Sequence, residues 1–387
     1  MGKRLIWVMA SIVMIAALVL AACGGGTPTT PTTPTTPTTP TTPTTPTEPG
    51  GEFQPAPPTG ETPAGTGPEM VKVTLQKLDG TTVEKIMEKP KPGGILRLVK
   101  TSDPRTFDET DSHEGLTWTV KFTNEELVQA DFRRSPTGTG EADWLYLKVA
   151  SLPYYVPALA ESWEMPEADT LILHLRKGVR YFVDPKNEAS RLVNGRELVA
   201  GDVIFSYNRS WKDSKTSWQA SSFPYDQYFK SMEATDKYTI VIKSQPGMVG
   251  GIWEMGLDHI VITPPEVVQK YGSLRDWRNA VGTGPFMITD YVQGSALTMR
   301  KNPDYWGYQP LFPEDKVPYV DEFKFLIVPD LSTRLTAMRT GKVDVFTGTA
   351  GGAVTWEDAA TLQKTNPELK FREYLSGSAA GVSFRVD

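Results

Sequence analysis

The pattern of apolar and polar positions predicts several β-strands from about residue 92 onward. Leucines occupy alternate positions from 171 to 175, which predicts a strand with one face turned inward and His174 on its outer face. The stretch 95–99, apolar except for Arg97, is typical of a buried strand. Further strands are predicted at 237–243, 296–300 and 322–328.

Pairs of residues typical of helix ends predict four helices between and after these strands. Strands and helices that do not alternate strictly favour an α/β or α+β domain over a barrel or a repeat array. The four predicted helices begin at Thr123 with Glu126 as a capping box, at 263–266 with Gly272 as the end, at Asp330 with Gly341 as the end, and at Thr355 with Asp358.

Residues 70–91 form a less regular lead-in arm. Val71, Val73 and Leu75 alternate as in a short strand, and residues 82–85 are compatible with the start of a short helix.

The N-terminus has the pattern of an export signal. Lys3 and Arg4 precede an apolar run over 5–20, and Ala21 and Ala22 lead into Cys23, the only cysteine. This arrangement resembles a bacterial lipoprotein signal, in which residues 1–22 are removed and the Cys23 thiol carries diacylglycerol. The alternative is an uncleaved membrane helix, because the run is nearly long enough to span a bilayer. Both alternatives tether the remaining chain outside the cytoplasmic membrane, whether in a periplasm or on the outer face of the cell.

A proline- and threonine-rich segment follows over residues 23–69. The triplet Pro-Thr-Thr repeats from 27 to 47, and proline at every third position favours an extended, solvated polyproline conformation. We expect a flexible stalk, and its threonine density leaves O-glycosylation open.

Composition excludes several classes of function. The net charge of −6 does not favour nucleic-acid binding, and a single cysteine allows no disulfide within the chain. The sequence contains no nucleophile elbow, and its three histidines are too widely spaced for a local metal motif. We therefore expect neither an enzyme nor a cofactor or metal.

Four stretches, in this order, resemble the family 5 extracellular solute-binding proteins of ABC transporters, the oligopeptide, dipeptide and nickel-binding group. Each alone is a weak pattern, but the order and spacing behind the export signal make the set specific. The stretches are PALAESWE (157–164) with 173–179, NGREL (194–198) with GDVIFSY (201–207), GTGPF (282–286) with KNPDYW (301–306), and 320–334 with GKVDV (341–345).

The resemblance implies a periplasmic-binding-protein-like clamshell, of the class with an extra subdomain. It further implies a lipid-anchored receptor that captures a peptide or a similar small solute and delivers it to an ABC permease. We expect residues 92–387 to form the N-terminal part of the solute-binding domain, and we expect a monomer. Most signature residues are predicted to be architectural; Gly341, for example, ends a helix.

The sequence departs from the family in three places. Residues 180–193 are longer than the usual turn, and Val199 stands where a hydroxyl residue commonly caps the next helix. The chain stops at Asp387, before the second lobe expected from the family. The sequence therefore represents either a fragment or a truncated gene product.

Five residues are candidates for ligand contact. Glu109 and Asp111 lie in the loop after the first strand, which family members use at the cleft. Trp118, Trp218 and Tyr225 are chosen because aromatic side chains with a polar edge suit such a cleft, although core packing is the ordinary role of each.

Three alternatives to a transport receptor remain. The first is a sensing lipoprotein coupled to a regulatory partner, and the second is a fragment that binds no solute. The third is an extracytoplasmic hydrolase, which the missing catalytic motifs disfavour.

Overall fold

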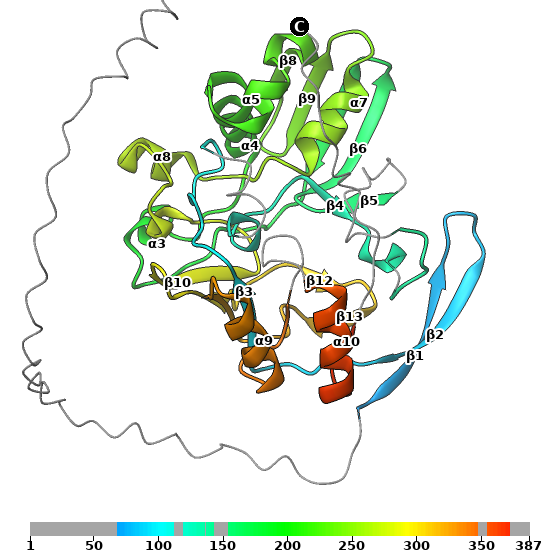
Figure 1. The fold of residues 1–387 in the computed structure, drawn as a ribbon. Coiled ribbons are helices and arrows are strands. Elements are labelled where there is room, and N and C mark those ends of the chain that lie inside the picture. Colours follow the sequence, from blue (N-terminus) through cyan, green and yellow to red (C-terminus); the bar gives the residue numbers. More distant parts are fainter. Residues whose placement is uncertain (1–67, 112–118, 136, 143–153, 347–353, 372–387) are drawn as a thin grey trace, which may run out of the picture. The chain divides into compact units, whose positions relative to one another are not determined.

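The computed structural model describes residues 68–111, 119–135, 137–142, 154–346 and 354–371 (Figure 1). The chain divides into two units, Met1–Ala64 and Gly65–Asp387, and every described residue belongs to the second. The export signal, Cys23 and nearly all of the predicted stalk lie outside the described residues. None of the described helices is both long and apolar enough to cross a membrane.

A four-stranded antiparallel sheet confirms the predicted strand around Leu173. Leu171, Leu173 and Leu175 are almost completely buried, while His174 is partly exposed and contacts Glu164, 2.8 Å away. The sheet order is β6-β7-β9-β8. The strands are β6 (Ala160–Glu167), β7 (Thr170–Leu175), β9 (Thr239–Ser244) and β8 (Phe229–Ala234).

The strand predicted at 237–243 is β9 of this first sheet, and a second four-stranded sheet contains the strands predicted at 95–99, 296–300 and 322–328. Its order is β10-β11-β14-β3, with β14 and β3 parallel and the other neighbours antiparallel. The strands are β10 (Phe286–Val292), β11 (Ala296–Lys301), β14 (Glu322–Ile327) and β3 (Ile95–Lys100).

Short helices cover the sheets. They are α3 (Glu188–Val193), α4 (Ala200–Tyr207), α5 (Trp218–Ser222), α6 (Tyr225–Tyr228), α7 (Val249–Ile252), α8 (Pro265–Tyr271), α9 (Leu331–Arg339) and α10 (Trp356–Thr365). The 3₁₀-helices are η1 (Val120–Phe122), η2 (Phe132–Arg134) and η6 (Trp277–Asn279), and the π-helices are η4 (Asn208–Asp213) and η5 (Trp253–Leu257). Two small two-stranded sheets pair β4 (Val128–Ala130) with β5 (Tyr155–Pro157) and β12 (Tyr308–Gln309) with β13 (Phe312–Lys316).

Three of the four predicted helices are confirmed at their caps. Gly272 ends α8 in the left-handed conformation, and the side chains of Asp330 and Thr355 accept hydrogen bonds from the first turns of α9 and α10. The helix predicted at Thr123 is wrong. Thr123 follows η1, and its carbonyl accepts a hydrogen bond from Gly284, so tertiary contacts use the backbone that a helix would need.

The lead-in arm is a β-hairpin of β1 (Met70–Gln76) and β2 (Thr82–Glu88). The strand expected around Val73 is confirmed, and the short helix considered for residues 82–85 is wrong. Antiparallel pairing along all of β1 satisfies the backbone of these residues without a helix.

The structure shows what two of the departures from the family pattern, segment 180–193 and Val199, form. The long segment 180–193 contains α3, whose N-cap Asn187 accepts a hydrogen bond from Ser190. Val199 precedes α4 and has no capping oxygen. Asp202 accepts a hydrogen bond from the Val199 amide at 3.0 Å and so satisfies part of the helix start.

A largely buried glutamate joins the two segments of the third signature stretch, 282–286 and 301–306. The Glu125 carboxylate accepts hydrogen bonds from Thr283 Oγ1 at 2.7 Å, Tyr305 Oη at 2.8 Å and Trp306 Nε1 at 2.9 Å. Burial raises the pKa of Glu125 to about 7, although these three donors favour the ionised form. Tyr305 and Trp306, adjacent in the sequence, therefore share one acceptor.

The neighbouring residue, Asn124, completes this junction. Its side-chain amide donates to the carbonyls of Ile262, at 2.9 Å, and Val281, at 3.0 Å. At Gly282 a Cβ atom would lie 2.0 Å from the Thr123 carbonyl oxygen, so only glycine allows this close approach.

Replacing Glu125 by alanine is expected to destabilise the fold. Alanine offers no oxygen to the three donors, which would leave polar groups inside the protein without partners. We expect the Glu125→Ala variant to lose about 1–3 kcal/mol of unfolding free energy at pH 6, below the raised pKa of Glu125, in urea titrations. The control is Glu233→Ala, at an exposed position of β8. Equal stability of the two variants would contradict the role of the three donors.

Candidate functional site

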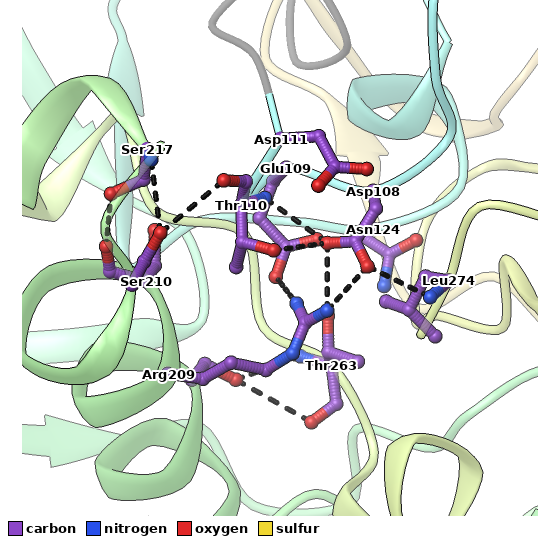
Figure 2. Close-up of polar contacts among 12 residues, drawn as sticks. Asp108, Glu109, Thr110, Asp111, Asn124, Arg209, Ser210, Ser217, Thr263 and Leu274 are labelled. Carbon is purple, nitrogen blue, oxygen red and sulfur yellow. Dashed lines mark hydrogen bonds and ion pairs between the residues drawn. The ribbon is translucent and has the colours of Figure 1, made fainter. Parts of the chain in front are cut away.

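Side chains of the loop after β3 form hydrogen bonds within the loop itself, in addition to contacts with other segments (Figure 2). The Asp108 amide donates to Thr106 Oγ1 at 3.0 Å, and Asp108 Oδ1 accepts from the Thr110 amide at 3.1 Å. Thr106 Oγ1 also donates to Asp111 Oδ2 at 3.2 Å. Short polar side chains of this kind stabilise turns. We call residues 106–111 the strap.

A single guanidinium binds two consecutive carboxylates of the strap. Arg209 Nη2 lies 2.7 and 2.5 Å from the two oxygens of Asp108, and Nη1 donates to Glu109 Oε1. All three side chains are buried: 13% of the Arg209 side chain and at most 2% of the two carboxylate side chains are exposed. Buried charge-assisted contacts of this type are the strong ones among hydrogen bonds.

This group buries two negative charges and one positive charge. Burial raises the pKa of Glu109 to about 7, against the attraction of Arg209 and with the repulsion of Asp108. Burial acts in the same direction on Asp108. There, Arg209 and the amide hydrogen bonds outweigh it and hold the pKa below its usual value. Glu109 Oε2 is buried and has no hydrogen-bond partner among the described residues.

Further contacts fix the strap to two other segments. The Thr110 carbonyl accepts from Ser214 Oγ at 3.3 Å and from Thr216 Oγ1 at 2.6 Å. The Arg275 guanidinium lies 2.5 and 2.8 Å from the two oxygens of Asp111. The amide of Leu274, next to Arg275, donates to Asp108 Oδ2 at 2.8 Å. The strap therefore contacts both the segment after α4 and the segment after α8.

Arg209 lies on a π-helix. The segment η4 continues α4 directly, and π-helical turns are rare and frequent at functional sites. Trp211 of η4 is buried, and its Nε1 donates to the Phe223 carbonyl at 2.6 Å. A Cβ atom at Gly256, on the second π-helix η5, would lie 2.8 Å from the Trp211 ring. The two π-helices thus pack closely where Gly256 meets the Trp211 ring.

The structure separates the two described aromatic candidates. Trp218 is partly exposed, and its ring lies 5.1 Å from Phe223 and 5.3 Å from His259 between centroids. It immediately follows Ser217, whose amide donates to the Ser214 side chain, so it adjoins the segment that binds the strap. Tyr225 instead stacks on Phe229, with 4.4 Å between the ring centroids, and the Lys212 ammonium lies over its ring. Trp118 lies outside the described residues.

A polar group lies beside Trp218, whose ring is 5.3 Å from that of His259. Asp258 accepts from Tyr155 Oη at 2.6 Å and pairs with His259 Nδ1. In the described part of the chain, no three histidine, cysteine or acidic side chains are arranged to hold a metal ion. Two surface cavities of about 580 and 470 Å³ lie elsewhere, the first beside β10, β11 and β14 and the second beside α3, and no candidate residue lines either.

Glu109 and Asp111 lie on the loop after β3, as the sequence predicted, but the sequence did not indicate Arg209 or Arg275, which bind their carboxylates. Arg209 follows the signature stretch 201–207 by two positions, where it resembles any polar residue at a helix end. The only sequence signal available was two adjacent acidic residues, Asp108 and Glu109, whose burial would require a cation. The sequence does not show which arginine supplies it.

Comparison with known proteins identifies a family. Residues 154–386 match the family described as "Bacterial extracellular solute-binding proteins, family 5 Middle". Among curated proteins, heme-binding protein A of Haemophilus influenzae is 28% identical over 249 residues, which cover 60% of this chain and 41% of that protein. The dipeptide-binding protein of Escherichia coli is 28% identical over 49% of this chain and 36% of its own length. The chain thus spans about two fifths of these relatives.

Solved structures confirm the expected fold class. The periplasmic binding protein DppA of Helicobacter pylori, in complex with the peptide STSA, superposes with a TM-score of 0.53 at 24% identity, over 71% of this chain and 49% of that one. Haemophilus influenzae OppA, in complex with a peptide, gives a TM-score of 0.53 at 21% identity and the same coverage. This chain therefore shares the mixed α/β fold of about half the length of each of these binding proteins.

The buried Glu109 carboxyl predicts a pH-dependent stability. Its folded-state pKa of about 7 lies above the ordinary 4.5, so the folded protein holds a proton that the unfolded chain releases. This contribution is complete below about pH 4.5 and is lost as the pH rises through 7. Between pH 5 and 8 the protein should lose up to about 3 kcal/mol more unfolding free energy than the Glu109→Gln variant.

Urea titrations at both pH values measure this difference. The raised pKa of Glu125 and Glu126 contributes equally to the protein and to the variant, so it cancels in the comparison. Parallel pH profiles would contradict the assignment.

Proposed function

Since the chain belongs to family 5 of the bacterial extracellular solute-binding proteins, we propose that it captures a peptide or a similar small organic solute outside the cytoplasmic membrane. It delivers this solute to the permease of an ABC importer and catalyses no reaction itself. The observation that carries the proposal is the family match over residues 154–386, more than half of the chain.

The names of the relatives support a peptide as the solute. Salmonella typhimurium SapA is named a peptide transport periplasmic protein, and the Escherichia coli relative binds dipeptides. The similarity to heme-binding protein A favours heme as a second candidate. Because the chain spans only part of each relative, these ligands are proposed for the protein as the cell makes it.

The strap and the adjoining aromatic side chain supply the proposed contacts. Asp111 keeps 21% of its side chain exposed, and Trp218 is partly exposed beside the segment that binds the strap. Trp118 and Tyr225 remain proposed on the basis of residue type alone. A partly exposed indole and a carboxylate together suit a ligand with apolar and polar groups.

We also propose that Cys23 anchors the protein to the membrane through lipid. The support is the sequence Leu-Ala-Ala-Cys after the apolar run, followed by the proline- and threonine-rich segment. The protein acts as a monomer in this proposal, since one receptor domain encloses one solute.

Ligand binding is tested on the native protein released from its membrane. The panel is Met-Leu, Ser-Thr-Ser-Ala and hemin, titrated by calorimetry. We expect one peptide to bind with a Kd of about 10 μM or lower. Asp111→Ala and Trp218→Ala should each weaken it about tenfold, since each removes one contact worth about 1.4 kcal/mol. The control Lys186→Ala, on an exposed turn, should not change affinity. Binding of hemin alone would favour the second candidate, and no binding at all would refute solute capture by these probes.

The lipid anchor has a separate test. The native protein should partition into the detergent phase of Triton X-114, and the mass of its N-terminal peptide should include diacylglycerol on Cys23. The Cys23→Ser variant should retain residues 1–22, because the peptidase requires the modified cysteine. An unmodified N-terminal peptide that still contains the apolar run in the wild-type protein would instead indicate a membrane helix.

A further inference from the structure

The strap connects two separately packed parts of the described unit. Its N-terminal neighbour β3 belongs to the second sheet, whose core contains Leu98 and Phe325. Arg209 follows α4, which packs in the other core around Trp211. The ion pairs of Arg209 with Asp108 and Glu109 therefore tie the loop from one core to a helix of the other.

The tie depends on the shape of the guanidinium. Asp108 and Glu109 are consecutive, and both reach the same side chain because the strap turns at Thr110. Arginine presents several N–H donors in one plane, so it can bind both oxygens of Asp108 and one of Glu109 together. A lysine ammonium at this position would preserve the charge but not this set of contacts.

The same tie determines where the exposed part of the strap lies. Asp108 receives the amides of Thr110 and Leu274 on the two oxygens that Arg209 binds. Asp111, one residue beyond Thr110, is the partly exposed end of the strap. Glu109, in contrast, is buried with its carboxylate on Arg209, so a solute would meet Asp111 before it met Glu109.

We propose that Arg209 is a positioning residue, which acts with Glu109 and Asp108 to hold the strap in the conformation that presents Asp111 to the solute. In this assignment Glu109 affects binding through Arg209 and does not contact the solute. The inference rests on the proposed function for its effect on affinity, but the positioning of the strap is measurable without any solute.

The first measurement is native-state hydrogen exchange of the Thr110 and Leu274 amides. In Arg209→Ala both amides should exchange about tenfold faster or more, while those of β7 and β9 keep their protection. Millimolar guanidinium chloride should restore the protection by filling the vacated site, and sodium chloride at the same ionic strength should not. The control Arg278→Ala removes an arginine that is 63% exposed and pairs with Asp276, so it should change neither amide.

Arg209→Lys covers the case in which Arg209→Ala does not fold. It keeps the buried charge, and the same two amides should still exchange faster than in the wild-type protein. Unchanged protection in Arg209→Lys and Arg209→Ala, or a uniform loss of protection over the whole protein that guanidinium does not reverse, would overturn the proposal.

The second measurement is the affinity for Ser-Thr-Ser-Ala. Arg209→Ala should weaken its binding about tenfold or more, and guanidinium should restore it together with the amide protection. If the wild-type protein binds no Ser-Thr-Ser-Ala, the peptide proposal fails for this probe, while the exchange experiment still decides the role of Arg209. Restored protection without restored peptide affinity would overturn the link between the strap and binding.

Discussion

The burial of ionised side chains is the constraint on which this structure depends most. Glu125 and Arg209 are both largely removed from water, and each is tolerable only because several distant segments supply partners. The donors to Glu125 lie 158 to 181 positions further along the chain. The donors around a buried carboxylate must be accurately placed, because displacing one of them leaves the charge without both water and a hydrogen-bond partner. The polar junctions therefore specify one packing of segments that apolar contacts alone would leave less defined.

Local signals predicted the elements whose backbone is satisfied locally. Helix α8 ends at the left-handed Gly272, α9 and α10 begin at side chains that cap their first turns, and β7 buries every second side chain. The capping box at Thr123 failed because its surroundings are tertiary. The amide of Leu127 donates to the carbonyl of Leu257, and the carbonyl of Thr123 accepts from Gly284. Patterns within a few residues cannot reveal a partner more than a hundred positions away.

The candidate site shows the same limit in its chemistry. The sequence placed two acidic residues on a loop after the first strand, and this position is correct. It did not show that Glu109 is buried or that Arg209, 100 positions away, binds it. The π-helix that carries Arg209 has no recognisable sequence pattern. It differs from an α-helix in forming hydrogen bonds five residues apart instead of four, and this spacing requires no particular residue type. Resemblance to a family identified the loop, but the division of its residues into buried and exposed required the structure.

The parallel pairing of β3 with β14 has a consequence for the order of folding. Gly94 and Asp321, at the start of this pair, are bonded across 227 positions, whereas the first sheet is built from strands within 160–244. Closing so long a loop costs conformational entropy before any contact compensates for it, and such pairings form slowly. The first sheet can assemble while β3 still lacks its neighbour. We therefore expect β3, which comes first in the sequence among the strands of the two sheets, to pair among the last, against the order in which the chain is synthesised.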